Sequence, residues 1–107
     1  AELGPWFPRD AIAGFHTSVG PWIRERDVAV VGSDASTDVQ PSLVEGMRLP
    51  LHNFLIAGLG ITMLDNMDLE ALAETAAREN RWEFMVTIGP IPVTGGTGSP
   101  VNALAVF

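Results

Sequence analysis

The segment Val28-Ala29-Val30-Val31 constrains the fold of this chain more than any other. Its four consecutive residues are apolar and three of them are β-branched, so a strand formed here has no polar face. A strand that is apolar on both faces is typical of a sheet that other layers cover on both sides. Because Gly32-Ser33-Asp34 ends the run, we predict a short, covered, central strand rather than an edge strand.

Helical and strand periodicities elsewhere in the chain predict an α/β fold. Apolar residues at i, i+3, i+4 and i+7 begin at Leu69 and indicate an amphipathic helix that ends at Asn80. Alternation over residues 82–88 indicates a strand. The other predicted elements are a helix that begins near Ser18, a loop over 33–50, a helix over 51–58, and strands over 61–64 and 101–107. This order of elements is typical of the α/β class with a mostly buried mixed sheet.

Composition excludes several classes of protein. The 107 residues suffice for one modest domain. Thirteen acidic side chains outnumber six basic ones, all of them Arg, and the net charge of −7 argues against a nucleic-acid partner. The absence of Cys excludes disulfides, thiolate nucleophiles and Cys-ligated zinc. No apolar run reaches the ~18 residues of a membrane span and no secretory signal opens the chain, so we expect a soluble, cytoplasmic protein without a membrane partner.

The opening of the chain has the character of a connector. It begins with Ala1 rather than Met, and Pro5 and Pro8 favour an extended backbone. We expect residues 1–13 to form a connector. Residues 1–107 are then either a single domain or a fragment of a larger one.

His52 and Asp65 are the first candidates for a metal site. His52 lies in the first turn of its predicted helix, and Asp65 follows the next predicted strand. About eight helical residues carry the chain ~12 Å one way, and four strand residues carry it back ~13 Å. The two side chains should therefore lie at the same level, and both types can bind a divalent metal. The alternative is a partly buried helix residue and a turn residue, because a catalytic zinc usually has three protein ligands rather than two.

The loop after the first predicted strand is a second candidate. Asp34 and Asp38 lie at the carboxyl end of that strand, where α/β folds place their ligands. Turn formation explains these residues equally well, because Asp, Ser36 and Thr37 side chains can all cap local backbone groups. Both interpretations stay open at this point.

Two further features favour structural roles. The loop Gly95–Pro100 lacks the Gly-Lys-[Ser/Thr] ending of a phosphate-binding loop and precedes no predicted helix, so we predict a tight turn. His16 stands beside Phe15 and belongs to no metal-binding motif, and we expect it to be a structural histidine.

Four segments of the chain are similar to corresponding segments of one family: Pro21-Trp22-Ile23-x-Glu25-Arg26-x-Val28-Ala29-Val30-x-Gly32-Ser33-Asp34, Pro50-x-His52, Leu64-Asp65-Asn66-x-Asp68-Leu69-x-x-Leu72-Ala73, and Gly95-Gly96-Thr97-Gly98-Ser99-Pro100-Val101. The chain thereby resembles the metal-dependent cyclase family of hydrolases, which includes bacterial kynurenine formamidases and isatin hydrolases. The resemblance covers nearly all of the chain from Gly14 onward.

This resemblance implies a swivelling β/β/α fold and an assembly of several copies. Family members are longer than this chain, and their signature His-x-Gly-Thr-His-x-Asp-x-Pro-x-His, which supplies the main metal ligands, is absent here. The chain then corresponds to the C-terminal portion of a larger cyclase-like domain and should be inactive by itself. Family members often add a further His and a Glu from this portion, and the positions similar to these are His52 and Asp65. Asp in place of Glu is a departure, because its side chain is shorter.

The function that the resemblance implies is hydrolysis of an amide or lactam bond in a small, aromatic molecule with a divalent metal, zinc or manganese. His52 would be a catalytic proton carrier or a metal ligand, and Asp65 a ligand or a carboxylate that orients His52. We expect this chain alone to hold no metal tightly, and to pair with a missing N-terminal part or with further copies of itself. The alternative is a non-catalytic assembly module that associates through exposed apolar edge strands.

Overall fold

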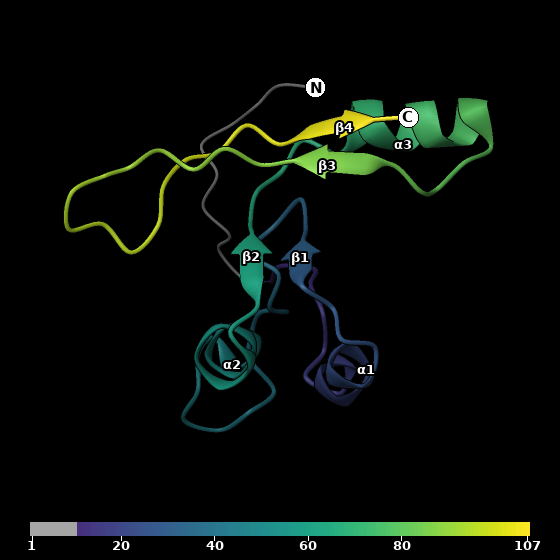
Figure 1. Cartoon of the computed structure of the whole chain (residues 1–107). Coiled ribbons are helices and arrows are strands. Elements are labelled where there is room, and N and C mark those ends of the chain that lie inside the picture. Colours follow the sequence, from purple (N-terminus) through teal and green to yellow (C-terminus); the bar gives the residue numbers. More distant parts are fainter. Residues whose placement is uncertain (1–10) are drawn as a thin grey trace. The chain divides into compact units, whose positions relative to one another are not determined.

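Strands β1 (Val30–Gly32) and β2 (Thr62–Leu64) lie side by side and run parallel in the computed structural model (Figure 1). They belong to the first of two compact units into which the chain divides, Ala1–Asp68 and Leu69–Phe107. Parallel neighbours need a long crossover connection. Here the crossover is a loop followed by a helix, which together bring the chain back to the start of β2.

The structure describes residues 11–107. Residues 1–10, and with them most of the connector predicted over residues 1–13, lie outside the described part of the chain. Ile12 pairs with Gln40 in an antiparallel bridge through two backbone hydrogen bonds of 3.0 Å. The loop between β1 and the next helix is thus tied to the segment that precedes the first helix.

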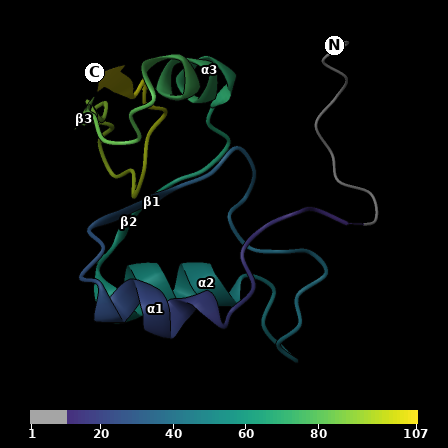
Figure 2. The same ribbon diagram turned by 90° about the vertical axis from the view of Figure 1, so that its right-hand side faces the viewer.

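Two helices pack against each other in the first unit. They are α1 (Val19–Glu25) and α2 (Pro50–His52), which continues as the π-helix η1 (Asn53–Leu59) (Figures 1 and 2). Their apolar faces and the parallel strands enclose a core in which five aliphatic side chains are buried: Ile23, Val31, Leu51, Leu55 and Ile61. Each such side chain stabilises the fold by about 1.5–3 kcal/mol. This core fixes the start of α2 relative to the end of β2, where the candidate site lies.

The helix that carries His52 begins and ends at residues suited to those positions. Pro50 stands in its first turn, where a backbone N–H has no partner inside the helix. Gly60 ends it with a φ of 68°, a left-handed conformation that glycine adopts without strain. The helix predicted over 51–58 is therefore confirmed, whereas nothing in the sequence indicated its π-helical hydrogen bonding.

The π-helical turn changes which side chains face the core. Leu51 and Leu55 are buried, whereas Phe54, three residues after Leu51, is 39% exposed. A π-helix closes its hydrogen bonds at i+5 rather than i+4, so an i+3 neighbour rotates off the face that i+4 neighbours share. Phe54 instead lies over Gly20 of α1, where an added Cβ would come within 3.0 Å of its ring.

The second unit holds one helix and an antiparallel strand pair. Helix α3 (Glu70–Glu79) ends at Asn80, whose φ of 47° is left-handed, in agreement with the predicted terminator. Strands β3 (Met85–Thr87) and β4 (Leu104–Val106) pair with Val86 opposite Ala105, and all six strand residues are exposed. They are shorter than the predicted strands, because the ladder stops after three residue pairs.

The predicted α/β class and the predicted order of elements are confirmed by the structure. The sheet differs from the single, mostly buried mixed sheet that we expected. Residues 11–107 form one parallel pair and one separate antiparallel pair, and Val31 and Leu64 are the buried residues of these strands. The reason is that no further layer covers the outer faces of these strands within the described residues. Among the same residues, no helix has the length and apolar character of a membrane span.

Candidate functional site

Three segments of the first unit meet at the imidazole ring of His52. The loop after β1 brings the carboxylate of Asp38 to 2.6 Å from His52 Nδ1. The end of β2 brings Asp65 Oδ2 to 2.8 Å from His52 Nε2. The ring thus has one carboxylate on each nitrogen, and we call these three residues the Asp–His–Asp cluster.

Asp38 is the buried member of the cluster, with a side chain 1% exposed. Its Oδ1 accepts a hydrogen bond from the backbone N–H of Leu51 at 2.7 Å, and its Oδ2 accepts one from the N–H of His52 at 3.2 Å. The residue before the helix, Leu49, makes no side-chain cap, so Asp38 satisfies these N–H groups from a distant part of the chain. A buried carboxylate is stable only when it is hydrogen-bonded, and here the same bonds fix the ring of His52.

Asp65 divides its two carboxylate oxygens between two partners. Oδ2 faces His52, and Oδ1 accepts a hydrogen bond of 2.6 Å from the hydroxyl of Thr37, which is fully buried. The side chains of His52 and Asp65 are 20% and 27% exposed. The contact between them is therefore the side of the cluster that solvent reaches.

The two carboxylates control the protonation of His52. Burial is the largest single effect and alone would lower the pKa of the ring. The hydrogen bonds to Asp38 and Asp65, together with their negative charges, outweigh burial and raise the pKa above its usual value of 6.5. A carboxylate only accepts hydrogen bonds, so both ring nitrogens carry a proton when both contacts are hydrogen bonds. Without a metal, the cluster favours the imidazolium form.

The structure brings together two of the candidates that the sequence singled out. His52 and Asp65 were expected at the same level, and their 2.8 Å contact confirms that placement. Of the two carboxylates after the first strand, Asp38 joins the cluster and also caps a helix, whereas Asp34 is exposed. The alternative of local turn capping does not describe Asp38, because the backbone N–H groups that it caps belong to Leu51 and His52, 13 and 14 residues further along the chain.

Two other candidates lie elsewhere. His16 is exposed, and its Nδ1 contacts the hydroxyl of Ser18 at 2.8 Å and accepts from the N–H of Ser18 at 3.2 Å. This is a local contact at the start of α1, as expected for a structural histidine. The Gly95–Pro100 loop belongs to the second unit, contains a turn with Gly95 at a φ of 75°, and precedes a strand rather than a helix.

Sequence reasoning did not connect Asp38 or Thr37 with His52 and Asp65. One signal was available, because Asp38 and Asp65 each follow a strand, and the carboxyl ends of parallel neighbours lie at the same edge of a sheet. The contact between Thr37 and Asp65 had no comparable signal. It depends on the path of an irregular loop across 28 residues of sequence separation.

A metal ion fits this cluster only in part. No group of three or more His, Cys, Asp or Glu side chains is arranged to hold a metal among residues 11–107. The reason is that both carboxylate oxygens of Asp38 already accept hydrogen bonds from the ring and from backbone N–H groups. Two atoms of the cluster are then left to bind a metal, His52 Nε2 and Asp65 Oδ2. Tetrahedral ligands bound ~2.0–2.2 Å from zinc stand about 3.3–3.6 Å apart, so the 2.8 Å between these two atoms has to widen by about half an ångström before they can share an ion. The pair can supply two ligands, and a complete site needs more.

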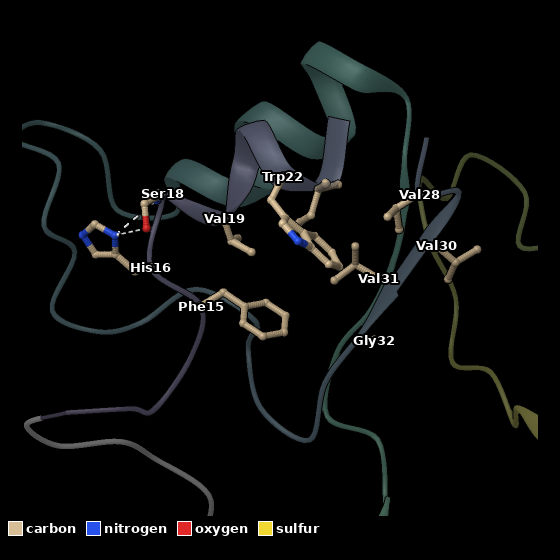
Figure 3. A pocket seen from close by; sticks show the side chains of 10 residues that line it. Phe15, His16, Ser18, Val19, Trp22, Val28, Val30, Val31 and Gly32 are labelled. Carbon is tan, nitrogen blue, oxygen red and sulfur yellow. Dashed lines mark hydrogen bonds between the residues drawn. The ribbon is translucent and has the colours of Figure 1, made fainter. Parts of the chain in front are cut away.

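One pocket of the described chain lies away from the cluster. It has a volume of about 560 Å³ and is lined mainly by apolar side chains of α1 and β1, among them Phe15, Trp22 and Val31. Figure 3 shows His16 and Ser18 at one end of it and Val30 at the other. No member of the Asp–His–Asp cluster is among the residues that line this pocket.

Comparison with known proteins supports the fold. A solved structure described as a novel cyclase is similar to this chain with a TM-score of 0.80 and 32% sequence identity. The similarity covers 91% of this chain and 31% of that protein, so the chain spans less than a third of the length of the cyclase that it matches. No family model and no curated protein matches the chain. The fold is therefore cyclase-like, and the narrower resemblance to kynurenine formamidases and isatin hydrolases stays a prediction.

Proposed function

We propose that this chain is part of a cyclase-family hydrolase that depends on a divalent metal, and that it supplies His52 and Asp65 to the metal site. The observation that carries this proposal is the 2.8 Å contact between His52 Nε2 and Asp65 Oδ2, backed by Asp38 on the other ring nitrogen. A carboxylate behind a ligating histidine is the usual arrangement in metal sites, because it fixes the tautomer and the orientation of the ring.

Each residue of the cluster has a distinct task in this proposal. Asp38 holds the Nδ1–H of His52, so that the lone pair of Nε2 points to the position where the metal would bind. Asp65 presents Oδ2 to the same position while Thr37 holds Oδ1. When bound, the metal lowers the pKa of a water molecule and polarises the carbonyl group of the substrate. Zinc and manganese are the metals that we propose, since His and carboxylate donors suit both.

The substrate class that we propose is the amide or lactam bond of a small aromatic molecule. This part of the proposal depends on the resemblance of the quoted segments to kynurenine formamidases and isatin hydrolases. Cleavage of such a bond needs a proton for the leaving nitrogen, and an imidazole near the metal is suited to carry it. His52 is the candidate within this chain, either in that role or as a ligand. The remaining metal ligands then come from the part of the protein that this chain does not contain.

A second candidate function is a non-catalytic assembly module. The observation that favours it is the apolar surface of the β3–β4 pair, where four large side chains are each about half exposed or more: Met85, Val86, Leu104 and Val106. Exposed apolar strands are typical of surfaces that pair with another chain. A larger enzyme that forms oligomers could also use this strand pair for association. The non-catalytic module is a separate function only if the complete protein hydrolyses no substrate.

The test is hydrolysis by the complete protein that contains this chain. We expect it to cleave aryl formamides or aromatic lactams, to lose that activity when a chelator removes the metal, and to regain it with zinc or manganese. The product amine or acid can be followed by absorbance. If the complete protein cleaves none of these substrates with either metal and still associates, the module is the better account.

A further inference from the structure

We propose that Thr37 is a positioning residue for Asp65: its hydroxyl holds one carboxylate oxygen so that the other faces His52. The placement itself concerns only residues of this chain, and its consequence for metal binding depends on the proposed function. Thr37 is not a ligand in this account, because its hydroxyl is fully buried behind Asp65.

The first support is the geometry of the Asp65 carboxylate. Thr37 Oγ1 donates to Oδ1 at 2.6 Å, and Oδ2 lies 2.8 Å from His52 Nε2. The carboxyl group of an Asp side chain can rotate about its Cβ–Cγ bond, and Asp65 is 27% exposed, so packing alone does not hold it. The bond from Thr37 fixes which oxygen faces the ring.

The second support is the direction of the hydroxyl chain behind Asp65. Ser33 Oγ lies 2.8 Å from Thr37 Oγ1 and also 2.9 Å from the backbone oxygen of Ala35. Each hydroxyl has one proton and a carboxylate has none to give. The proton of Thr37 therefore goes to Asp65, and the proton of Ser33 is shared between Thr37 and Ala35. Ser33 thus orients the hydroxyl of Thr37 toward Asp65.

The third support is the backbone at Thr37. Its φ of 59° lies in the left-handed region, which β-branched residues rarely adopt. Such strain persists only where the surroundings fix the residue, and here the carbonyl of Thr37 accepts from the N–H of Phe15 at 2.7 Å. Gly or Asn would suit this backbone better, so the residue present is explained by its hydroxyl rather than by the turn.

The turn also joins the two sides of the cluster. Thr37 holds Asp65, which contacts Nε2, and the next residue, Asp38, contacts Nδ1. Two consecutive residues of one loop therefore control both carboxylates around the ring. A displacement of this turn would release His52 on both sides, whereas loss of the Thr37 hydroxyl alone should release it on one side.

This difference gives the test. In the metal-free chain at a pH below 6.5, where His52 is protonated, both ring N–H protons can be followed by NMR. In Thr37→Val, which keeps the shape but removes the hydroxyl, we expect the Nε2–H signal to weaken through faster exchange with water while the Nδ1–H signal persists. Thr37→Ser keeps the hydroxyl and should restore both signals. Ser42→Ala removes a hydroxyl hydrogen bond outside the cluster and serves as the matched control.

The outcomes are decisive in either direction. An unchanged Nε2–H signal in Thr37→Val overturns the proposal, and so does equal loss of both signals in a folded Thr37→Val chain, since that indicates a general role of the turn. If Thr37→Val does not fold, Thr37→Ser decides: loss of its Nε2–H signal contradicts the proposal, and retention supports it.

Zinc titration of the same variants separates this inference from the proposed function. The wild-type chain should bind weakly, because two donors converge, and Thr37→Val should bind about 10-fold or more weakly still. Thr37→Ser and Ser42→Ala should match the wild type. A wild-type chain whose His52 signals do not respond to zinc counts against the metal site, while the N–H spectra still decide whether Thr37 positions Asp65.

Discussion

His52 Nε2 and Asp65 Oδ2 lie 2.8 Å apart although 13 residues separate them in the chain. The helix that follows His52 and the strand that precedes Asp65 run in opposite directions, so the chain returns to the level from which it started. Asp38 completes the arrangement from the other side of the ring. The geometry therefore depends on three segments, and each segment can be tested separately.

Asp38→Ala should destabilise the chain strongly. The carboxylate satisfies two backbone N–H groups and the ring of His52 while it is 1% exposed, and loss of one partner of a buried charged pair costs about 3–5 kcal/mol. Urea unfolding measures the change. Asp34→Ala, which removes an exposed carboxylate from the same loop, is the control and should change the free energy of unfolding by less than about 0.5 kcal/mol. Similar changes in the free energy of unfolding for the two variants would show that Asp38 does not stabilise the start of the helix.

The stability of the metal-free chain should fall as the pH rises. The pKa of His52 is raised in the folded state by Asp38 and Asp65, so the folded state binds its proton more tightly than the unfolded state does. This contribution is fully present below the unfolded value of 6.5 and is lost as the pH rises through the folded pKa. Urea midpoints measured from about pH 5.5 upward, above the range of ordinary carboxylates, should show the decline. In His52→Gln the decline should be absent, and an equal decline in both proteins would assign it to another group.

In the complete protein, His52→Ala should reduce amide hydrolysis by about 10²-fold or more, the usual effect of losing a proton carrier or a metal-site group. His16→Ala is the matched control, because His16 is exposed and contacts only Ser18 among the hydrogen bonds observed for its ring. Its kcat/KM should stay within about threefold of the wild type. Equal losses in the two variants would contradict the assignment of the site to His52.

The 107-residue chain should associate at micromolar concentration. Met85 and Val106 lie opposite each other on one face of the β3–β4 pair and are 61% and 50% exposed, and burial of each such side chain contributes up to about 1.5–3 kcal/mol. Val106→Glu should weaken the association in sedimentation experiments. Asn102→Glu adds the same charge at an exposed position outside the strands and should not. A wild-type chain that sediments as a monomer and melts cooperatively would identify a self-sufficient domain.

The parts of the fold with a regular rise per residue were predictable. Helix α3 follows from the spacing of Leu69, Leu72 and Ala76, and the contact of His52 with Asp65 follows from the lengths of one helix and one strand. Periodicity indicates the geometry of a local segment. Helix α3 is one such segment, and the contact between His52 and Asp65 depends on two of them, one helix and one strand.

The roles of Asp38 and Thr37 were not predictable in the same way. The loop over 33–49 has no period, and its path depends on distant backbone contacts such as Phe15 to Thr37. The prediction of a mostly buried sheet was wrong for a related reason. The apolar character of Val30 shows that the strand can be covered, but its exposure, which is 42%, depends on what packs against it. Sequence pattern predicts the faces of an element, whereas burial depends on its neighbours.

The central claim is that His52 and Asp65 bind a metal, and diffraction by the zinc-loaded complete protein tests it most directly. Anomalous scattering at the zinc absorption edge locates the ion without any assumption about its ligands. We predict an ion within about 2.0–2.2 Å of His52 Nε2 and of an oxygen of Asp65, with Asp38 still on Nδ1. Zinc found on other residues, with the 2.8 Å contact between His52 and Asp65 intact, would contradict the account.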